Sequence, residues 1–352
     1  MINKSFFSTE ILRWFRENGR DLPWRETRDP YAIWLSEIIL QQTRIAQGWE
    51  YWERFVQTYP KVEDLAAASE DDVLKLWQGL GYYSRARNLH TAAKQIVALG
   101  GFPNTLEGIK SLKGVGDYTA AAIGSFAFDI PAAVVDGNVY RVLSRYFGID
   151  TPINSTQGKK EFAALAQSLL PASDAASYNQ GMMDFGAIQC TPQSPKCLLC
   201  PLAETCEALR CGRVEELPVK NKTVKVKTRH LSYIYIRCKS SAADGIGKSE
   251  PMVAIHRRGE GDIWQGLWEP YNVSDVKELP SFVKNPILLA KNVKHVLTHR
   301  ILLADFYLLE TESRPSLPDD YIWIKESEIE DYGVPRLIEI LLEKINPAGK
   351  EK

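Results

Sequence analysis

The chain has 352 residues, of which 45% are hydrophobic and 25% are charged, a composition typical of a globular protein and not of a long disordered region. Its formal net charge is −1, so nucleic-acid binding would require local basic patches. No apolar run is long enough to cross a bilayer, which excludes a membrane-spanning helix.

The amino-terminal segment predicts an amphipathic helix that ends at Gly19. Charged side chains at Glu10, Arg13 and Arg16 interrupt its apolar residues, so the segment does not have the pattern of a secretion signal. We therefore expect an intracellular protein.

Residues 1 to about 215 predict a helical region, because periodic apolar stretches alternate with helix start and stop signals. Asp29-Pro30 is typical of a helix start, Gly100-Gly101 is typical of a helix end, and Pro171 would stop a third helix. Residues 216–228 are polar and basic, which predicts an interdomain linker.

The pattern changes after this linker. Alternating or β-rich runs predict strands at residues 231–237, 252–258, 301–309 and 321–324. Residues 335–345 predict a closing helix.

Four of the six cysteines are separated by six, two and five residues. They are Cys190, Cys197, Cys200 and Cys206. Prolines interrupt the segment, which favours a short loop wrapped around a metal centre. Zinc also accepts four thiolates, and disulfide pairing is a further alternative that is typical of secreted proteins.

Residues 112–119 predict a tight turn between two helices. Gly114 and Gly116 would let the backbone approach an anion, and amides at the start of the next helix can bind a phosphate. By itself this pattern also suits an ordinary helix–turn–helix corner. Together with the cysteine spacing and residues 134–142, it resembles the helix–hairpin–helix of the endonuclease III superfamily of DNA glycosylases, over residues 5–210.

This resemblance implies an all-α helix–hairpin–helix catalytic domain at residues 1–215. A six-helix module would span about 25–132, and an iron–sulfur module would combine residues 1–24 with 133–215. In this superfamily the six-two-five spacing binds a [4Fe-4S] cluster, so the resemblance implies that cofactor in a structural role, with the four cysteines as its ligands.

Asp136 precedes a glycine, and such an aspartate is most often a turn or N-cap residue. In the superfamily this position carries the carboxylate that faces the sugar, where an anion stabilises positive charge on C1′ as the base leaves. Asn138 would orient that carboxylate or a water.

Members that also cut the backbone have a lysine before Thr119, whereas this chain has Tyr118. A phenol cannot form an imine, so we expect a hydrolytic, monofunctional glycosylase.

Glu37 lies on a predicted helix beside Ile33, Trp34 and Leu40. Burial among these apolar groups would raise the pKa of its carboxyl and keep a proton available near neutral pH, although a solvated glutamate is the alternative. The surrounding residues 36–43 resemble the MutY-type adenine DNA glycosylases. That resemblance implies that Glu37 is the general acid that protonates adenine.

Removing a base from duplex DNA requires its extrusion from the stack. By resemblance, Leu80 would be a wedge, Tyr82 an intercalating ring and Gln42 a polar contact. Trp24 and Arg25 match pocket-side positions of the family. Without the resemblance, Leu80 and Tyr82 would be interpreted as packing residues and Trp24 as a core residue.

Residues 229–352 resemble the α+β Nudix-like C-terminal domain of the same glycosylases, which recognises the base opposite adenine. The Phe-Ser-His loop that recognises 8-oxoguanine in the family matches Leu297, Thr298 and His299, so the aromatic face is lost at Leu297. A β-hairpin turn is the structural alternative. The sequence has no glutamate-rich metal-binding box of Nudix hydrolases, which argues against pyrophosphatase activity.

We therefore expect a monomeric enzyme of the bacterial cytoplasm that binds double-stranded DNA and removes adenine mispaired with 8-oxoguanine or guanine. The nearest alternative is an endonuclease III-type pyrimidine glycosylase and lyase, against which Tyr118 argues. A non-catalytic, metal-containing DNA-binding protein and a nucleotide pyrophosphohydrolase are alternatives from other classes.

Overall fold

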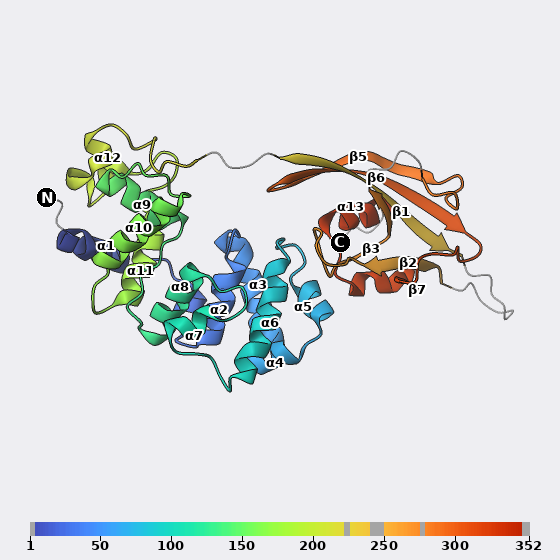
Figure 1. Ribbon diagram of the computed structural model, residues 1–352, viewed down its shortest axis with the longest axis horizontal. Coiled ribbons are helices and arrows are strands. Elements are labelled where there is room, and N and C mark those ends of the chain that lie inside the picture. The colour runs from blue at the N-terminus through green and yellow to red at the C-terminus, as the bar shows by residue number, and fades with distance from the viewer. Residues whose placement is uncertain (1–3, 222–225, 240–249, 275–278, 347–352) are drawn as a thin grey trace. The chain divides into compact units, whose positions relative to one another are not determined.

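The computed structural model describes residues 4–221, 226–239, 250–274 and 279–346 (Figure 1). Contacts divide the chain into two compact units, residues 1–67 with 88–222 and residues 68–87 with 223–352. Positions 222–225 of the predicted linker lie outside the described residues. Within the described residues, no helix has both the length and the apolar character that crossing a membrane would require.

The described part of the first unit is built from helices and short helical turns. Its elements are α1 (Lys4–Asn18), η1 (Pro23–Arg25), α2 (Pro30–Ile39), α3 (Ile45–Thr58), α4 (Val62–Ala67), most of α6 (Ser84–Ala98), α7 (Leu106–Lys110), α8 (Asp117–Phe128), α9 (Gly137–Phe147), α10 (Thr156–Leu169), α11 (Ala175–Asp184), η2 (Phe185–Gln189), η3 (Cys197–Leu199), η4 (Ala203–Thr205) and α12 (Glu207–Arg210). This confirms the predicted helical character of the amino-terminal half.

Helix α2 begins as the sequence predicts. Asp29 is its N-cap and accepts a hydrogen bond from the Tyr31 amide at 3.0 Å, while Pro30 occupies the first helical position, where no amide hydrogen is needed. The side chains from Tyr31 to Ile39 are all buried, and α2 packs against α8. A helix buried on all sides holds its side chains rigidly, which suits a site that must be preorganised.

Helix α9 is defined by a cap at each end. Asp136 accepts a hydrogen bond from the Val139 amide at 2.7 Å and so caps the amino terminus. Gly148 has φ +69° and ends the helix in the left-handed region. An added Cβ at Gly148 would lie 2.5 Å from Glu207 Cγ, so a larger residue would be excluded by space as well as by backbone strain.

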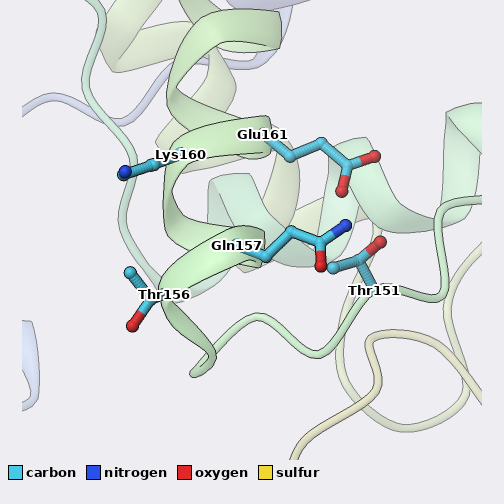
Figure 2. A pocket seen from close by; sticks show the side chains of 5 residues that line it. All are labelled: Thr151, Thr156, Gln157, Lys160 and Glu161. Atoms are coloured by element: carbon cyan, nitrogen blue, oxygen red, sulfur yellow. The ribbon is translucent and has the colours of Figure 1, made fainter.

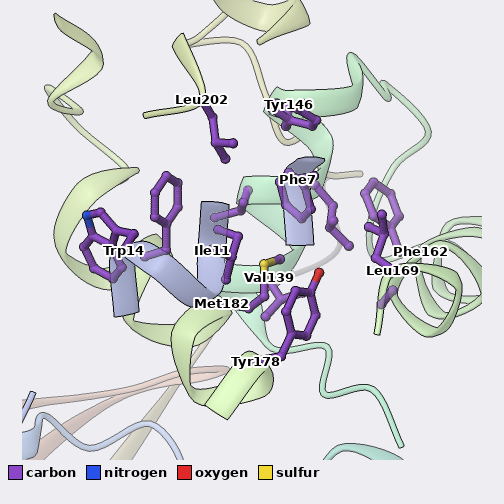
Figure 3. Packing of buried hydrophobic residues seen from close by; sticks show 14 of the residues in the cluster. Phe7, Ile11, Trp14, Val139, Tyr146, Phe162, Leu169, Tyr178, Met182 and Leu202 are labelled. Atoms are coloured by element: carbon purple, nitrogen blue, oxygen red, sulfur yellow. The ribbon is translucent and has the colours of Figure 1, made fainter. Parts of the chain in front are cut away.

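One apolar core holds α1 against α9, α10 and α11. Figure 3 shows Phe7, Ile11 and Trp14 of α1 in one cluster with Val139 of α9 and Met182 of α11. These side chains are between 0% and 7% exposed. Because the partly buried cysteines of the 190–206 segment pack against the same core, α9 and the cysteine segment are held in one rigid module.

The second unit contains a mixed sheet, α5 (Glu70–Leu76), η5 (Glu326–Asp331) and α13 (Arg336–Ile345). The strands are β1 (Lys227–Cys238), β2 (Met252–Arg257), β3 (Trp268–Glu269), β4 (Tyr271–Ser274), β5 (Ile287–Leu297), β6 (Arg300–Thr311) and β7 (Tyr321–Lys325). Their order is β3-β2-β1-β6-β5, with β4 paired to β1 and β7 paired to β2. Strands β1 and β6 are parallel from Lys227↔Arg300 to Cys238↔Thr311, and the other pairs are antiparallel.

Strand β1 is buried on both faces of this sheet. Tyr233 and Tyr235 face the core that includes Leu337 and Leu341 of α13, whereas Ile234 and Ile236 belong to a second apolar cluster. This arrangement explains why residues 233–236 contain no alternating polar side chain. The sheet and α13 confirm the predicted α+β class.

Residues 68–87 belong to the same compact unit as residues 223–352. The predicted domain boundaries place them in the helical domain. Arg257 Nη2 donates to Glu70 Oε1 at 2.8 Å, and Arg87 Nη1 donates to the Gln265 carbonyl at 2.6 Å. These are polar links between distant parts of the sequence, which periodicity in one segment does not reveal.

Candidate active site

The Glu37 side chain lies inside the first unit, not on its surface. It is 7% exposed and sits on α2 beside the buried Ile33 and Trp34. Its Oε2 accepts a hydrogen bond from the Tyr118 hydroxyl of α8 at 2.9 Å. The expected apolar surroundings are therefore present, and the solvated alternative is wrong.

Burial changes the proton affinity of this carboxyl. Desolvation is the largest cause, and the neighbouring Asp136 adds a second upward effect, so the pKa of Glu37 rises from 4.5 to about 7. The Tyr118 hydrogen bond and the Arg25 charge act in the opposite direction. A carboxyl with this pKa can carry and release a proton near neutral pH.

Asp136 is the N-cap of α9, and both oxygens of its carboxylate accept hydrogen bonds from that helix. Its Oδ1 accepts from the Val139 amide at 2.7 Å, and its Oδ2 accepts from Asn138 Nδ2 at 2.8 Å. Desolvation raises the pKa of Asp136, while these hydrogen bonds and Arg141 lower it. Glu37, Tyr118 and Asp136 influence one another electrostatically, so the structure brings these predicted residues together.

Asn138 extends this arrangement toward the cysteine segment. Its Oδ1 accepts from Arg141 Nη2 at 2.9 Å, and Arg141 Nε donates to the Cys190 carbonyl at 2.8 Å. Sequence reasoning missed Arg141, although an arginine on a helix whose neighbours are apolar is a signal for a buried polar contact. The chain of bonds links the carboxyl of Asp136 to the first cysteine.

Replacing Tyr118 with phenylalanine is expected to move the alkaline limb of the pH–activity profile to higher pH. The hydroxyl lowers the pKa of Glu37 by stabilising its charged form. Its loss would therefore keep Glu37 protonated to a higher pH. The measurement is single-turnover base release between pH 5 and 9, and a limb that stays fixed or moves to lower pH would contradict this account.

Trp24 and Arg25 belong to η1, which packs against α2. Trp24 is buried and packs edge-to-face against Trp49 and Trp52 at 5.7 and 5.6 Å between ring centroids. Arg25 donates to both oxygens of Asp184 at 2.9 and 2.8 Å. Asp184 is fully buried and was not singled out from the sequence, because its partner lies 159 residues away.

The predicted wedge residues have different environments. Leu80 is 8% exposed, whereas Tyr82 is 50% exposed. Tyr82 adopts φ +48° between Gly81 and Tyr83, and its hydroxyl is hydrogen-bonded to the Thr298 hydroxyl. Gln42 of the first unit is also exposed, with φ +57°. The buried position of Leu80 matches its packing interpretation, and Leu80 would have to move to act as a wedge.

The predicted hairpin precedes α8, with both glycines exposed. Gly114 has φ +79°, and an added Cβ would lie 2.7 Å from Asn88 Cβ. Gly116 is the N-cap of α8, and nothing lies within 4 Å of a Cβ built there. The turn therefore requires glycine at the first of these positions, and exposed amides are available beside the helix start.

Changing Gly114 to alanine is expected to destabilise the hairpin by roughly 1–3 kcal/mol, the usual cost of a strained backbone conformation. Duplex binding should weaken with it, because the exposed amides would move. Thermal unfolding and fluorescence anisotropy with a duplex would measure the two effects. Gly116→Ala serves as the matched control for thermal unfolding, because nothing lies within 4 Å of a Cβ built there. Equal losses of stability in the two variants would refute the steric explanation.

The four cysteines enclose a cavity of about 30 Å³ together with Arg145 and Gln189. None forms a disulfide, so that interpretation of their spacing is wrong. Desolvation raises the pKa of Cys197, Cys200 and Cys206, and the charges of neighbouring cysteines raise them further. These thiols would lose their protons only if a bound cation offset the charge of the resulting thiolates.

All four cysteines line one cavity, as the ligands of a single metal centre would. A single zinc would bring four sulfurs to about 2.3 Å from one point. Among the described residues, no group of three or more His, Cys, Asp or Glu side chains is placed to hold one metal ion. Four cysteines around one cavity match the ligand set of a [4Fe-4S] cluster.

Leu297, Thr298 and His299 join β5 to β6. Leu297 ends β5 opposite Arg300, and Thr298 and His299 form the turn between them. The β-hairpin alternative therefore describes the local structure correctly. A tight turn presents its side chains outward, so this geometry is also compatible with base recognition.

A surface hollow of about 700 Å³ lies elsewhere on the first unit (Figure 2). It is lined by Thr151, Thr156, Gln157, Lys160 and Glu161. None of the predicted site residues lines this hollow, so it is separate from the candidate active site.

Comparisons with known proteins agree with this architecture. A profile of the HhH-GPD superfamily of base excision DNA repair proteins matches residues 35–171. The iron–sulfur binding domain of endonuclease III matches residues 190–206, and a NUDIX domain profile matches residues 246–344. The chain thus carries a base excision repair domain of the helix–hairpin–helix class, and the predicted [4Fe-4S] cofactor is confirmed.

Curated relatives give a narrower family. The adenine DNA glycosylase of Buchnera aphidicola subsp. Schizaphis graminum (strain Sg) is 30% identical, over 96% of this chain and 98% of that protein. The human adenine DNA glycosylase is 43% identical, over 60% of this chain and 41% of the human protein. The chain belongs to the adenine DNA glycosylase family, as its sequence predicts.

Solved structures share the helical fold. A thermostable thymine-DNA glycosylase is 34% identical with a TM-score of 0.56, covering 59% of this chain and 97% of that one. Endonuclease III trapped on DNA is 23% identical with a TM-score of 0.53, covering 60% of this chain and 99% of that one. The second likeness concerns the fold alone.

Proposed function

We propose that this enzyme hydrolyses the N-glycosidic bond of adenine that is mispaired with 8-oxoguanine or guanine in duplex DNA. The observation that carries the proposal is the buried Glu37 carboxyl, whose pKa lies at about 7. Adenine is a poor leaving group at neutral pH, and a proton on a ring nitrogen makes its departure feasible. The adenine glycosylases among the relatives support adenine as the base.

In the proposed reaction, Glu37 gives its proton to a ring nitrogen of the extruded adenine. The bond between C1′ and the base then breaks, and its electron pair leaves with adenine. The Asp136 carboxylate stabilises the positive charge that develops on C1′. Water adds to C1′ and gives a proton to the Glu37 carboxylate, which restores the acid and leaves an abasic site.

Tyr118 and Asn138 would act as positioning residues. Tyr118 donates its hydrogen bond to Glu37, and burial together with the Glu37 charge raises its own pKa, so the phenol stays neutral. Asn138 Nδ2 donates a hydrogen bond to Asp136 Oδ2 at 2.8 Å, which orients the carboxylate. Because residue 118 has no amine, no imine forms there, and the enzyme releases base without cutting the strand through this position.

Base extrusion would use residues on several elements. Tyr82, with its exposed ring, would intercalate in the strand opposite the extruded adenine. Leu80 would fill the gap after moving outward, and Gln42 would make a polar contact with the DNA. Trp24 and Arg25 would line the adenine pocket. The amides around Gly114 and Gly116 would bind a backbone phosphate.

The opposite base would be recognised by the β5–β6 turn. Thr298 retains a hydroxyl and His299 an imidazole, whereas Leu297 offers no aromatic face for stacking. The [4Fe-4S] cluster would be bound by Cys190, Cys197, Cys200 and Cys206, where it supplies a compact anionic anchor for the loop. We expect a monomer that works on DNA in a bacterial cytoplasm.

Single-turnover base release tests this proposal with three matched duplexes, in which adenine lies opposite 8-oxoguanine, guanine or thymine. Free adenine should appear from the first two and not from the third. Borohydride should trap no enzyme on the DNA. Release from the thymine duplex at an equal rate, or release of an oxidised pyrimidine instead of adenine, would overturn the assignment.

A further inference from the structure

Arg145 is a buried arginine near the end of α9, at the cysteine segment. It is 2% exposed. Its Nη1 lies 3.4 Å from Cys190 Sγ and also donates to the Thr191 carbonyl at 2.7 Å. Its Nη2 donates to the Pro192 carbonyl at 3.1 Å. One guanidinium therefore contacts the first cysteine and the two residues that follow it.

The same side chain also fixes the segment that leaves the cysteine loop. Arg145 Nε donates to the Leu217 carbonyl at 3.1 Å. The fork thus joins the beginning of the loop to residues beyond its last cysteine. A buried guanidinium with its donors satisfied in this way is rigid, because moving it would leave several polar groups unpaired.

The cysteine sulfurs accept hydrogen bonds from different kinds of donor. Cys200 accepts a hydrogen bond from the Leu202 backbone, and Cys206 accepts from the Ala208 and Leu209 backbone. Cys190 is instead contacted by the Arg145 side chain. A substitution can therefore remove the donor to Cys190 without changing the backbone donors to the other two.

We propose that Arg145 is a positioning residue of the iron–sulfur centre, which donates a charge-assisted hydrogen bond to the Cys190 thiolate and locks the loop around it. A donor to a ligand sulfur withdraws electron density and stabilises the more negative, reduced form of a cluster. Arg145 thereby raises the reduction potential of the cluster and slows its loss. This role is separate from that of Arg141, which bonds to the Cys190 carbonyl and not to its sulfur.

The test compares full-length wild type with Arg145→Lys and with Arg141→Lys as the matched control. Lysine keeps the positive charge in both variants but cannot reproduce the fork. We expect Arg145→Lys to have a more negative cluster reduction potential by voltammetry. We also expect it to lose iron to a chelator about tenfold faster, the usual scale for removing a partner of a metal ligand. Arg141→Lys should keep the wild-type potential.

Unchanged potential and iron loss in Arg145→Lys would overturn the proposal, as would an equal change in both variants. If Arg145→Lys assembles no cluster, the proposal can be tested on wild-type protein in which only the arginines carry nitrogen-15. After one-electron oxidation or reduction with an added reagent, the cluster is paramagnetic and should show a hyperfine coupling to nitrogen-15, which persists in labelled Arg141→Lys. Absence of that coupling would overturn the proposal. No readout depends on which base the enzyme removes.

Discussion

Glu37→Gln is expected to lower the single-turnover rate of adenine release by about 10²–10⁴, the range attributed to general acid catalysis. Glutamine is close to glutamate in size, so it should occupy the same buried position on α2. It cannot supply a proton to the leaving base. The measurement is base release from a duplex with adenine opposite 8-oxoguanine, at enzyme concentrations that saturate binding.

The pH dependence gives a second test of the same group. The reaction requires protonated Glu37, so the rate should fall about tenfold per pH unit above the pKa of about 7. Glu50→Gln is the control, because Glu50 is an exposed glutamate on α3. A wild-type profile that stays flat between pH 6 and 9 would remove Glu37 from the role of acid.

Glu37→Gln should raise the stability of the protein at alkaline pH although it lowers the activity. The folded-state pKa of Glu37 is raised, so ionisation penalises the folded state progressively from about pH 4.5 and fully above about pH 7. A shift from 4.5 to about 7 corresponds to roughly 3 kcal/mol. Glu37→Gln avoids this penalty, and its free energy of unfolding at pH 8 should therefore exceed that of wild type.

Asp136→Asn is expected to lower the rate of base release by about 10²–10³, which is typical for removing one group that stabilises transition-state charge. Asparagine can still accept the Val139 amide hydrogen bond, so the cap of α9 should survive. The anion opposite the developing charge on C1′ would be lost. Single-turnover kinetics and thermal unfolding, measured together, separate these two contributions.

The same substitution should also move the pH profile. The Asp136 charge raises the pKa of Glu37, so its removal should shift the alkaline limb to lower pH, opposite to the shift expected for Tyr118→Phe. Asp129→Asn is a suitable control, because Asp129 is an exposed aspartate at the end of α8 with φ +54°. Asp136→Asn within a few-fold of the wild-type rate would contradict the proposed charge stabilisation.

Local sequence signals were sufficient for much of the fold. Asp29-Pro30 predicts the start of α2 because capping depends on residues only two or three apart. The apolar neighbours of Glu37 predict its burial for the same reason. The runs that become β1, β2, β6 and β7 were also recognised, since buried strands are rich in β-branched and aromatic residues.

The missed features depend on contacts between distant residues. Strand β5 was not predicted, because Ile287 and Leu288 are exposed and register shifts interrupt its pairing with β6. Its residues therefore show no regular alternation. The pair of Arg25 and Asp184 joins residues far apart in the chain, and Arg145 meets its loop partners from 45 residues away or more. One sequence does not reveal such pairs.

Helix α9 connects the catalytic carboxylate with the cysteine segment, so a substitution that disturbs either end should give the same repair defect. Asp136 caps the amino terminus of α9 and Arg145 lies in its last turn. At about 1.5 Å per residue, roughly 14 Å of helix separates them. A rigid rod transmits an axial slip from either end to the other, and misplacement of a reacting group by about 1 Å can cost a hundredfold in rate. Mutator alleles should therefore arise at positions such as Gly148, where a bulkier residue would push against Glu207. An inherited repair defect need not map to the surface that meets DNA.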